Sequence, residues 1–192
     1  MACRCQKIIL FCLLFLVSCT KETQVHQVII DQPIENGDIV LRREDGFVSS
    51  LFSSYASKAG VFSHVGIVAK DSVGSIGVIH CELKETKEPS SVRYETIENF
   101  LSFADTFAIY RLEYPSSVRD EVVDKVWQRY AKGARFDFDF NNSTDSLLYC
   151  TELIAKSIND ALGDSVVQPT TVFLEKPCFS LDDLTTHCIL IK

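Results

Sequence analysis

One of the eight cysteines, Cys150, lies where the polar residues 141–145 give way to the apolar helical pattern of residues 147–162. It therefore falls in the first turn of a predicted helix. Unpaired N–H groups and the helix dipole favour a thiolate at such a position, lowering the pKa of a cysteine from about 8.5 toward neutrality. Cys150 is the candidate nucleophile of the chain.

Two of the four histidines lie in neighbouring strand-like segments upstream of this cysteine. His64 falls within residues 63–69 and His80 within residues 76–83, and the turn-forming residues 70–75 join the two segments into a predicted hairpin. A cysteine hydrolase needs an imidazole that moves a proton and a third group that orients the imidazole. His64 is the predicted base.

The orienting group is expected to be His80 or Glu82, which project from the same side of their strand because residues two apart share a face. With the turn centred near residue 72 or 73, we predict that position 64 pairs with position 80 or 81. Glu82 would then lie up to about 6.6 Å farther along the strand. His80 is the preferred neighbour, and Glu82 is the alternative because a carboxylate is a good partner for imidazole.

Other groups near the cysteine have predicted roles as well. The backbone N–H of Cys150 is the simplest oxyanion donor. Tyr149 is expected to line the substrate pocket with its hydroxyl, although an aromatic residue at such a place more often only packs. Two histidines and a cysteine could bind zinc, but the tight ligand spacing of a hydrolytic zinc site, such as His-Glu-x-x-His, is missing. We therefore predict no metal and no cofactor.

The elements that position these residues form an α+β pattern, with antiparallel strands between helices. Further strands are expected at residues 37–41, 106–112 and 187–191, and further helices at residues 47–56, 96–103 and 115–132.

Composition indicates one globular domain. The chain has 192 residues, of which 46% are hydrophobic and 23% are charged, which is enough to bury a sizeable core. A net charge of −7 without a cluster of lysines or arginines argues against nucleic acid as a partner. We expect a monomer that acts on a peptide or on a small acyl-containing substrate.

The N-terminus reads as a secretory signal. Arg4 and Lys7 precede an apolar run over residues 8–17 that is too short to span a bilayer. The following Leu16-Val17-Ser18-Cys19 resembles a bacterial lipobox, which implies cleavage before Cys19 and lipidation of its thiol; ordinary signal cleavage nearby is the alternative.

These features predict three segments. Residues 1–18 are the signal peptide, residues 19–33 a polar tether, and residues 34–192 the folded domain. The protein would be a lipid-anchored component of the bacterial cell envelope, in contact with the membrane through its anchor and facing the periplasm or the cell exterior. Four cysteines remain in the domain, and a Cys178–Cys188 disulfide is possible in an oxidising compartment.

Four motifs in order resemble the YiiX-like branch of the NlpC papain-like superfamily, whose topology is circularly permuted. The resemblance spans about residues 34–160. It implies an antiparallel sheet packed against helices, with the cysteine helix C-terminal to the sheet. The motifs are Gly37-Asp38-Ile39-Val40, Ser63-His64-Val65-Gly66-Ile67-Val68, Val78-Ile79-His80 and Tyr149-Cys150-Thr151-Glu152-Leu153.

By this resemblance Cys150 is the nucleophile, His64 the base and His80 the third polar residue. The superfamily implies hydrolysis of amide bonds, such as those of cell-wall peptides, through an acyl-enzyme. Two alternatives stay open. Proteins similar to lecithin retinol acyltransferase share the order His, His, Cys and act on lipid esters, and a noncatalytic lipoprotein could use the same cleft to bind a peptide or an acyl chain.

Overall fold

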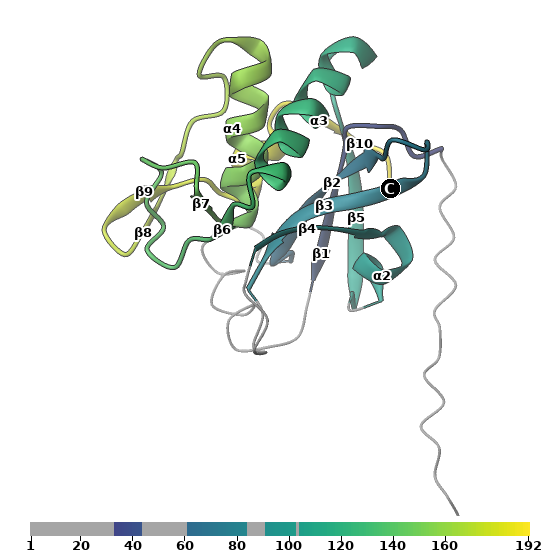
Figure 1. Ribbon diagram of the computed structural model, residues 1–192. Coiled ribbons are helices and arrows are strands. Elements are labelled where there is room, and N and C mark those ends of the chain that lie inside the picture. The colour runs from purple at the N-terminus through teal and green to yellow at the C-terminus, as the bar shows by residue number, and fades with distance from the viewer. Residues whose placement is uncertain (1–32, 44–60, 84–90, 103) are drawn as a thin grey trace, which may run out of the picture.

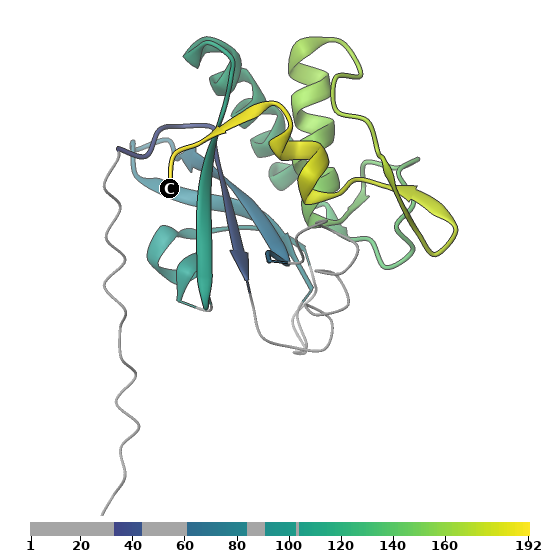
Figure 2. The same ribbon diagram turned by 180° about the vertical axis from the view of Figure 1, so that it is seen from behind.

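The computed structural model describes residues 33–43, 61–83, 91–102 and 104–192 (Figures 1 and 2). The predicted signal peptide, nearly all of the tether and the helix expected at residues 47–56 lie outside these ranges.

The described residues contain one eight-stranded sheet with strand order β10-β5-β1-β2-β3-β4-β6-β7, and a separate hairpin of β8 and β9. Neighbouring strands are antiparallel except for the short pair β6 and β7. The α+β fold class predicted from the sequence is confirmed. The strands are β1 (Asp38–Arg43), β2 (His64–Lys70), β3 (Ile76–Glu82), β4 (Ser91–Thr96), β5 (Thr106–Leu112), β6 (Arg135–Phe136), β7 (Leu147–Leu148), β8 (Thr171–Phe173), β9 (Lys176–Cys178) and β10 (Cys188–Leu190).

Four helices are described, and each is bounded by local sequence signals. They are α2 (Ile97–Leu101), α3 (Ser116–Ala131), α4 (Cys150–Leu162) and α5 (Leu181–Thr185). Pro115 precedes α3, where its fixed φ suits a helix start. Gly163 ends α4 in the left-handed conformation at φ 65° and donates its N–H to the carbonyl of Asn159.

The predicted cysteine helix at residues 147–162 begins later than expected. Leu147 and Leu148 form β7, and the helix starts at Cys150 itself. The polar residues 141–145 therefore do not cap it. The helix expected at residues 96–103 is also shorter than predicted. Thr96 ends β4, a strand that was not predicted, and caps α2, which ends at Leu101.

Side chains that alternate along the strands divide the sheet into two packing layers. One face packs against α3 and α4, and its buried core includes Ile39, Val65, Ile67 and Cys81. The opposite face packs against α2 through a smaller buried cluster: Val40, Val68, Val78, Phe100, Leu101 and Ile109. His64 and His80 have the same parity as Val68 and Val78, so they belong to the face covered by α2.

The hairpin between β2 and β3 has a different register from the predicted one. Gly66 pairs with His80 and Lys70 with Ile76, which extends to position 64 opposite position 82. The predicted pairing of position 64 with 80 or 81 is therefore wrong. The loop is centred on residue 73 because the Asp71 carboxylate accepts the N–H groups of Val73 and Ser75.

Gly66 allows α2 to approach the two histidines closely. A Cβ at this position would lie 2.3 Å from Val78 Cγ1 and 3.2 Å from both His80 Cβ and a ring carbon of Phe100. A side chain at position 66 would thus clash with Val78 and crowd Phe100, so glycine allows both to pack against β2.

We predict that Gly66→Ala lowers the free energy of unfolding by about 1–3 kcal/mol, because the added methyl group overpacks this layer. Urea denaturation measures the change. Combining it with Val78→Ala removes the closest clashing atom, so the double variant should be less destabilised than the sum of the two single variants. Strict additivity would contradict the proposed packing.

Candidate active site

The imidazoles of His64 and His80 are in direct contact across β2 and β3. Nε2 of His64 lies 2.9 Å from Nδ1 of His80, and the rings meet edge to face. His64 is 8% exposed and His80 is completely buried. The ring of Phe100 packs against both. The structure thus brings the predicted base and the predicted orienting residue together, diagonally across the ladder and not as a directly opposed pair.

Beyond His80 lies a carboxylate that the sequence analysis did not identify. Nε2 of His80 is 2.9 Å from Oε1 of Glu95 on β4, in a close contact that is bent away from ideal hydrogen-bond alignment. Partial burial acts to raise the pKa of Glu95, but His80, Arg42 and Arg93 together hold it below its ordinary value. Glu95 is therefore ionised at neutral pH, and His64, His80 and Glu95 form a continuous buried row.

Arg42 supports this row from β1. Its guanidinium is completely buried and lies over the Phe100 ring, 4.1 Å from the centroid. It donates to the Phe100 carbonyl and to Oε1 of Glu82 at 3.0 Å, and it lies 4.0 Å from Glu95. Burial, followed by the positive charge of Arg42 and the neighbouring His80, lowers the pKa of His64 well below its ordinary value. His64 is therefore neutral at neutral pH, which is the state that a general base needs.

Glu82, the alternative orienting residue, has other partners. Its carboxylate binds Arg42 at 3.0 Å and Arg93 at 2.8 Å. Both bonds tie the carboxylate to guanidinium groups, whereas the ring nitrogen of His64 is already paired with His80.

Cys150 lies in the first turn of its helix, as the sequence predicts, and is the first residue of α4, which packs against β2 and β3. Its side chain is 4% exposed and belongs to the core on the α3 and α4 face, together with Val65 and Cys81. The thiol of Cys150 and the imidazole of His64 thus lie on opposite faces of the sheet.

Tyr149 anchors the start of α4. Its side chain is completely buried, and its hydroxyl accepts the N–H of Phe179 and donates to Oδ1 of Asn142, both at 2.8 Å. Both hydrogen bonds are to groups of the protein itself, and a role of this hydroxyl in a substrate pocket stays a prediction. The bond to Phe179 fixes the helix start against the segment that leads into α5.

Glu152 places a second ionisable group in the first turn of α4. It is completely buried, its Oε2 accepts the N–H of Tyr149 at 3.3 Å, and its Oε1 lies 2.9 Å from Nζ of Lys156. Burial raises the pKa of Glu152 to about 7 despite Lys156.

The other thiols of the described domain are poor nucleophiles. Burial raises the pKa of Cys178 to about 11, that of Cys188 to about 12, and that of Cys81 well above its ordinary value. The disulfide considered between Cys178 and Cys188 is not formed in the structure.

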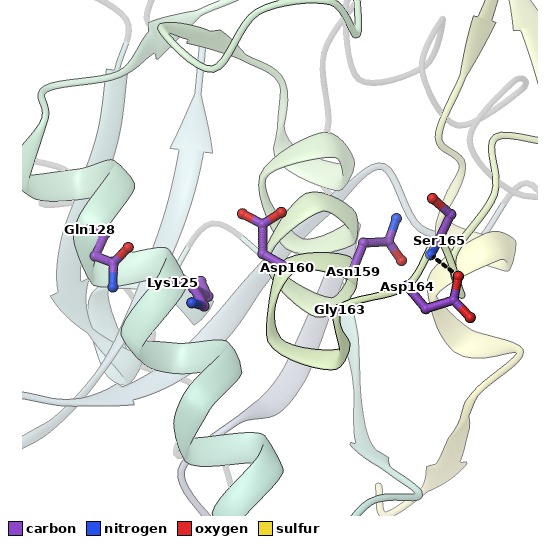
Figure 3. A pocket seen from close by; sticks show the side chains of 7 residues that line it. All are labelled: Lys125, Gln128, Asn159, Asp160, Gly163, Asp164 and Ser165. Atoms are coloured by element: carbon purple, nitrogen blue, oxygen red, sulfur yellow. Dashed lines mark hydrogen bonds between the residues drawn. The ribbon is translucent and has the colours of Figure 1, made fainter.

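A polar depression lies between α3 and the C-terminal end of α4 (Figure 3). It is open to solvent and lies at the opposite end of the helix from Cys150, roughly 18 Å away along the axis. Its polar groups are engaged internally: Asp160 pairs with Arg129, and Asn159 bonds the backbone of Val167. The residues lining it are Lys125, Gln128, Asn159, Asp160, Gly163, Asp164 and Ser165.

Within the described ranges, histidine, cysteine and carboxylate side chains do not gather in groups of three or more that could hold a metal ion. Nor does any helix in this part of the chain combine the length and apolar character needed to cross a membrane.

Comparison with known proteins places the chain in a family. Residues 33–186 match the permuted papain-like amidases of the YaeF/YiiX group, the C92 family. The chain belongs to this family. Since the family consists of cysteine peptidases and amidases, the protein is a cysteine hydrolase of that type, and the family resemblance inferred from the four motifs is confirmed.

A solved structure supports the same fold. The crystal structure of the metalloprotein yiiX from Escherichia coli O157:H7 superimposes with a TM-score of 0.53 at 20% identity, covering 70% of this chain and 69% of that one. No curated protein is significantly similar in sequence. At this identity the likeness to yiiX shows the permuted papain-like fold alone.

Sequence reasoning missed Glu95 and Arg42. A signal for Glu95 was present, because Val92 and Tyr94 alternate with Arg93 and Glu95 as in a half-buried strand. Nothing in the local pattern indicated that Arg42 would be buried.

The depressed pKa of His64 predicts a specific pH dependence of stability. In the unfolded chain His64 binds a proton near its ordinary pKa of about 6.5, whereas the folded protein resists protonation. The stability that depends on neutral His64 is therefore complete above about pH 6.5 and is lost as the pH falls, by at most about 1.4 kcal/mol per pH unit.

Glu152, with its raised pKa, has the opposite slope between its ordinary value of 4.5 and about 7. Glu152 contributes equally to the wild type and to His64→Gln, so its effect cancels in the difference between their free energies of unfolding. Urea unfolding at several pH values from about 5 to 8 should show that the wild type loses stability relative to the variant as the pH falls. A difference independent of pH would contradict the neutral, buried state of His64.

Proposed function

We propose that the protein is an envelope-tethered hydrolase that cleaves amide bonds of cell-wall peptides or related substrates through an acyl-enzyme on Cys150. His64 acts as the base, and His80 orients it. The observation that carries this proposal is the buried contact between His64, the first residue of β2, and His80 on β3. The helix α4, which begins at Cys150, packs against the same two strands.

The two layers of the sheet constrain how the thiol reaches the imidazole. His64 is the first residue of β2 and Cys150 the first residue of α4. We propose that the thiol of Cys150 and the imidazole of His64 meet at this end of the sheet. There the strands end, and side chains from opposite faces can approach each other around the end of the strand. Since His64 uses Nε2 to contact His80, its Nδ1 is the nitrogen left to take the thiol proton in the proposed reaction.

The reaction then follows the chemistry of a cysteine nucleophile. Nδ1 of His64 takes the thiol proton, and Sγ of Cys150 attacks the carbonyl carbon to form a C–S bond. When the C–N bond breaks, the imidazolium returns the proton to the leaving amine. Water attacks the thioester and gives a proton to His64; the C–S bond then breaks, which releases the carboxylic acid, and the thiolate of Cys150 takes the proton back from the imidazolium. The N–H of Cys150 is the proposed oxyanion donor.

Substrate class is the next question. Cell-wall peptides suit an envelope protein and the amidase chemistry of the family, whereas the shared order His, His, Cys also suits acyl transfer or lipid ester hydrolysis. Incubating the purified protein with muropeptides and, separately, with acyl esters and phospholipids distinguishes these reactions. Amide cleavage supports our proposal, and turnover of lipids alone would replace it with the ester-directed alternative.

Metal dependence is tested in the same assay. The similar protein yiiX is a metalloprotein, and two histidines with a cysteine are zinc-compatible ligands. The thiol mechanism predicts that dialysis against EDTA leaves hydrolysis unchanged. Loss of activity that zinc restores would contradict it.

Turnover of none of these substrates, combined with tight binding of a peptide or an acyl chain, would favour the noncatalytic alternative.

We predict that Cys150 is alkylated faster than the other thiols of the domain at about pH 7, because a helix N-terminus and an imidazole favour the thiolate. Peptide mass spectrometry after timed iodoacetamide treatment compares Cys150 with Cys178 and Cys188 in the same molecule. These internal controls have raised pKa values. Equal rates at all three would contradict the assignment of Cys150.

Cys150→Ala should fold normally and lose hydrolysis by at least about 1000-fold. Circular dichroism checks the fold. Retained activity in the folded variant would show that another group is the nucleophile.

The anchor is predicted separately. If Cys19 is lipidated, protein made in its native host partitions with membranes, and Cys19→Ser releases it or blocks its processing. Cys12→Ser is the matched control, since that residue lies within the predicted signal peptide. Unmodified, soluble wild-type protein would contradict the lipoprotein proposal without affecting the proposed chemistry.

A further inference from the structure

We propose that Glu95 is a positioning residue that fixes the tautomers of both histidines and so leaves Nδ1 of His64 free of hydrogen. The catalytic consequence rests on the proposed function, whereas the tautomers are measurable without any activity.

The contact between Glu95 and His80 sets the tautomer of His80. An ionised carboxylate can only accept hydrogen bonds. Oε1 of Glu95 lies 2.9 Å from Nε2 of His80, so this nitrogen must carry the proton that makes the contact favourable. In a neutral imidazole the other nitrogen, Nδ1, is then an acceptor.

The contact between the two imidazoles then sets the tautomer of His64. Its Nε2 lies 2.9 Å from Nδ1 of His80, and two bare nitrogens would repel each other. Nε2 of His64 must therefore donate, and Nδ1 of His64 is left bare. That is the nitrogen assigned above to the thiol. Glu95, which touches His64 only through His80, thus decides which nitrogen of the proposed base is available.

The surroundings of the pair favour the neutral form of His64. Within the described residues, the charged groups around the pair are Arg42 on β1, Glu82 on β3, and Arg93 and Glu95 on β4, while α2 contributes the uncharged Phe100. The positive charge of Arg42 opposes protonation of His64. A buried chain of hydrogen bonds with fixed polarity is also more favourable than unpaired groups.

Glu82 provides a matched control. Like Glu95, it is a mostly buried carboxylate on the same face and contacts the same arginine, Arg42. It differs in that its described contacts are with Arg42 and Arg93, whereas Glu95 touches His80. Removing Glu82 perturbs the local charge without removing the proposed acceptor.

The test is long-range ¹H–¹⁵N NMR of the ¹⁵N-histidine-labelled full chain at about pH 7.5, with signals assigned through His64→Gln and His80→Gln. The wild type should show both residues protonated on Nε2. Glu95→Ala should shift both toward the Nδ1–H form, because His80 is then free to donate to His64. Glu95→Gln should largely restore the wild-type pattern through its amide oxygen, and Glu82→Gln should leave it unchanged.

Three results would overturn the proposal: a wild-type His80 protonated on Nδ1 or on both nitrogens, unchanged tautomers in a folded Glu95→Ala, or the same shift in Glu82→Gln. In an active preparation, Glu95→Ala should lower kcat by roughly 10- to 100-fold, as loss of an outer partner that orients an imidazole typically does, with KM nearly unchanged. If the tautomers behave as expected but no hydrolysis is found, the proposed function fails and the positioning role of Glu95 stands.

Discussion

The contact between the two imidazoles is the interaction on which the rest of the site depends. Two aromatic, polar rings are buried beneath a short helix, and their nitrogens can be left neither unpaired nor freely charged without a cost of several kcal/mol. The structure satisfies them in sequence, from His64 to His80 to Glu95. Because Gly66 has no side chain, the ring of Phe100 can pack against the two imidazoles. The fold on the α2 side of the sheet is thus arranged around one polar row.

Arg42 is the counterpart of this row. A buried guanidinium is tolerated only when its charge is compensated, and here two carboxylates, a carbonyl and an aromatic face surround it. It balances the negative charge of Glu82 and Glu95 and disfavours a proton on His64. The same residue therefore contributes to folding and keeps the proposed base neutral.

Much of the fold follows from local pattern. Strand-like alternation predicted β5 at residues 106–112, and helical spacing with Pro115 and Gly133 predicted α3, both as found. The first-turn position of Cys150 was likewise readable, because apolar spacing and Gly163 define its helix. These features depend on residues close in sequence, for which periodicity is informative.

What depended on long-range pairing was harder to predict. His80 was chosen over Glu82 from a register that is wrong by one or two residues, and the two histidines meet because rings can span a diagonal neighbour distance. Glu95 escaped notice because its role comes from the pairing of β3 with β4, which no local motif specifies. The hydrogen bonds of Tyr149 could not be predicted either, because its partners, Asn142 and Phe179, come from separate segments.

The central claim is that catalysis passes through a thioester on Cys150 formed with the help of His64. Intact-mass and peptide mass spectrometry of protein quenched in acid during turnover of an activated acyl substrate tests it most directly. We expect an acyl adduct on the Cys150 peptide that decays at the rate of hydrolysis, forms far more slowly in His64→Gln and is missing in Cys150→Ala. Hydrolysis at the wild-type rate in Cys150→Ala, or an adduct on any other residue that decays at the turnover rate, would contradict the account.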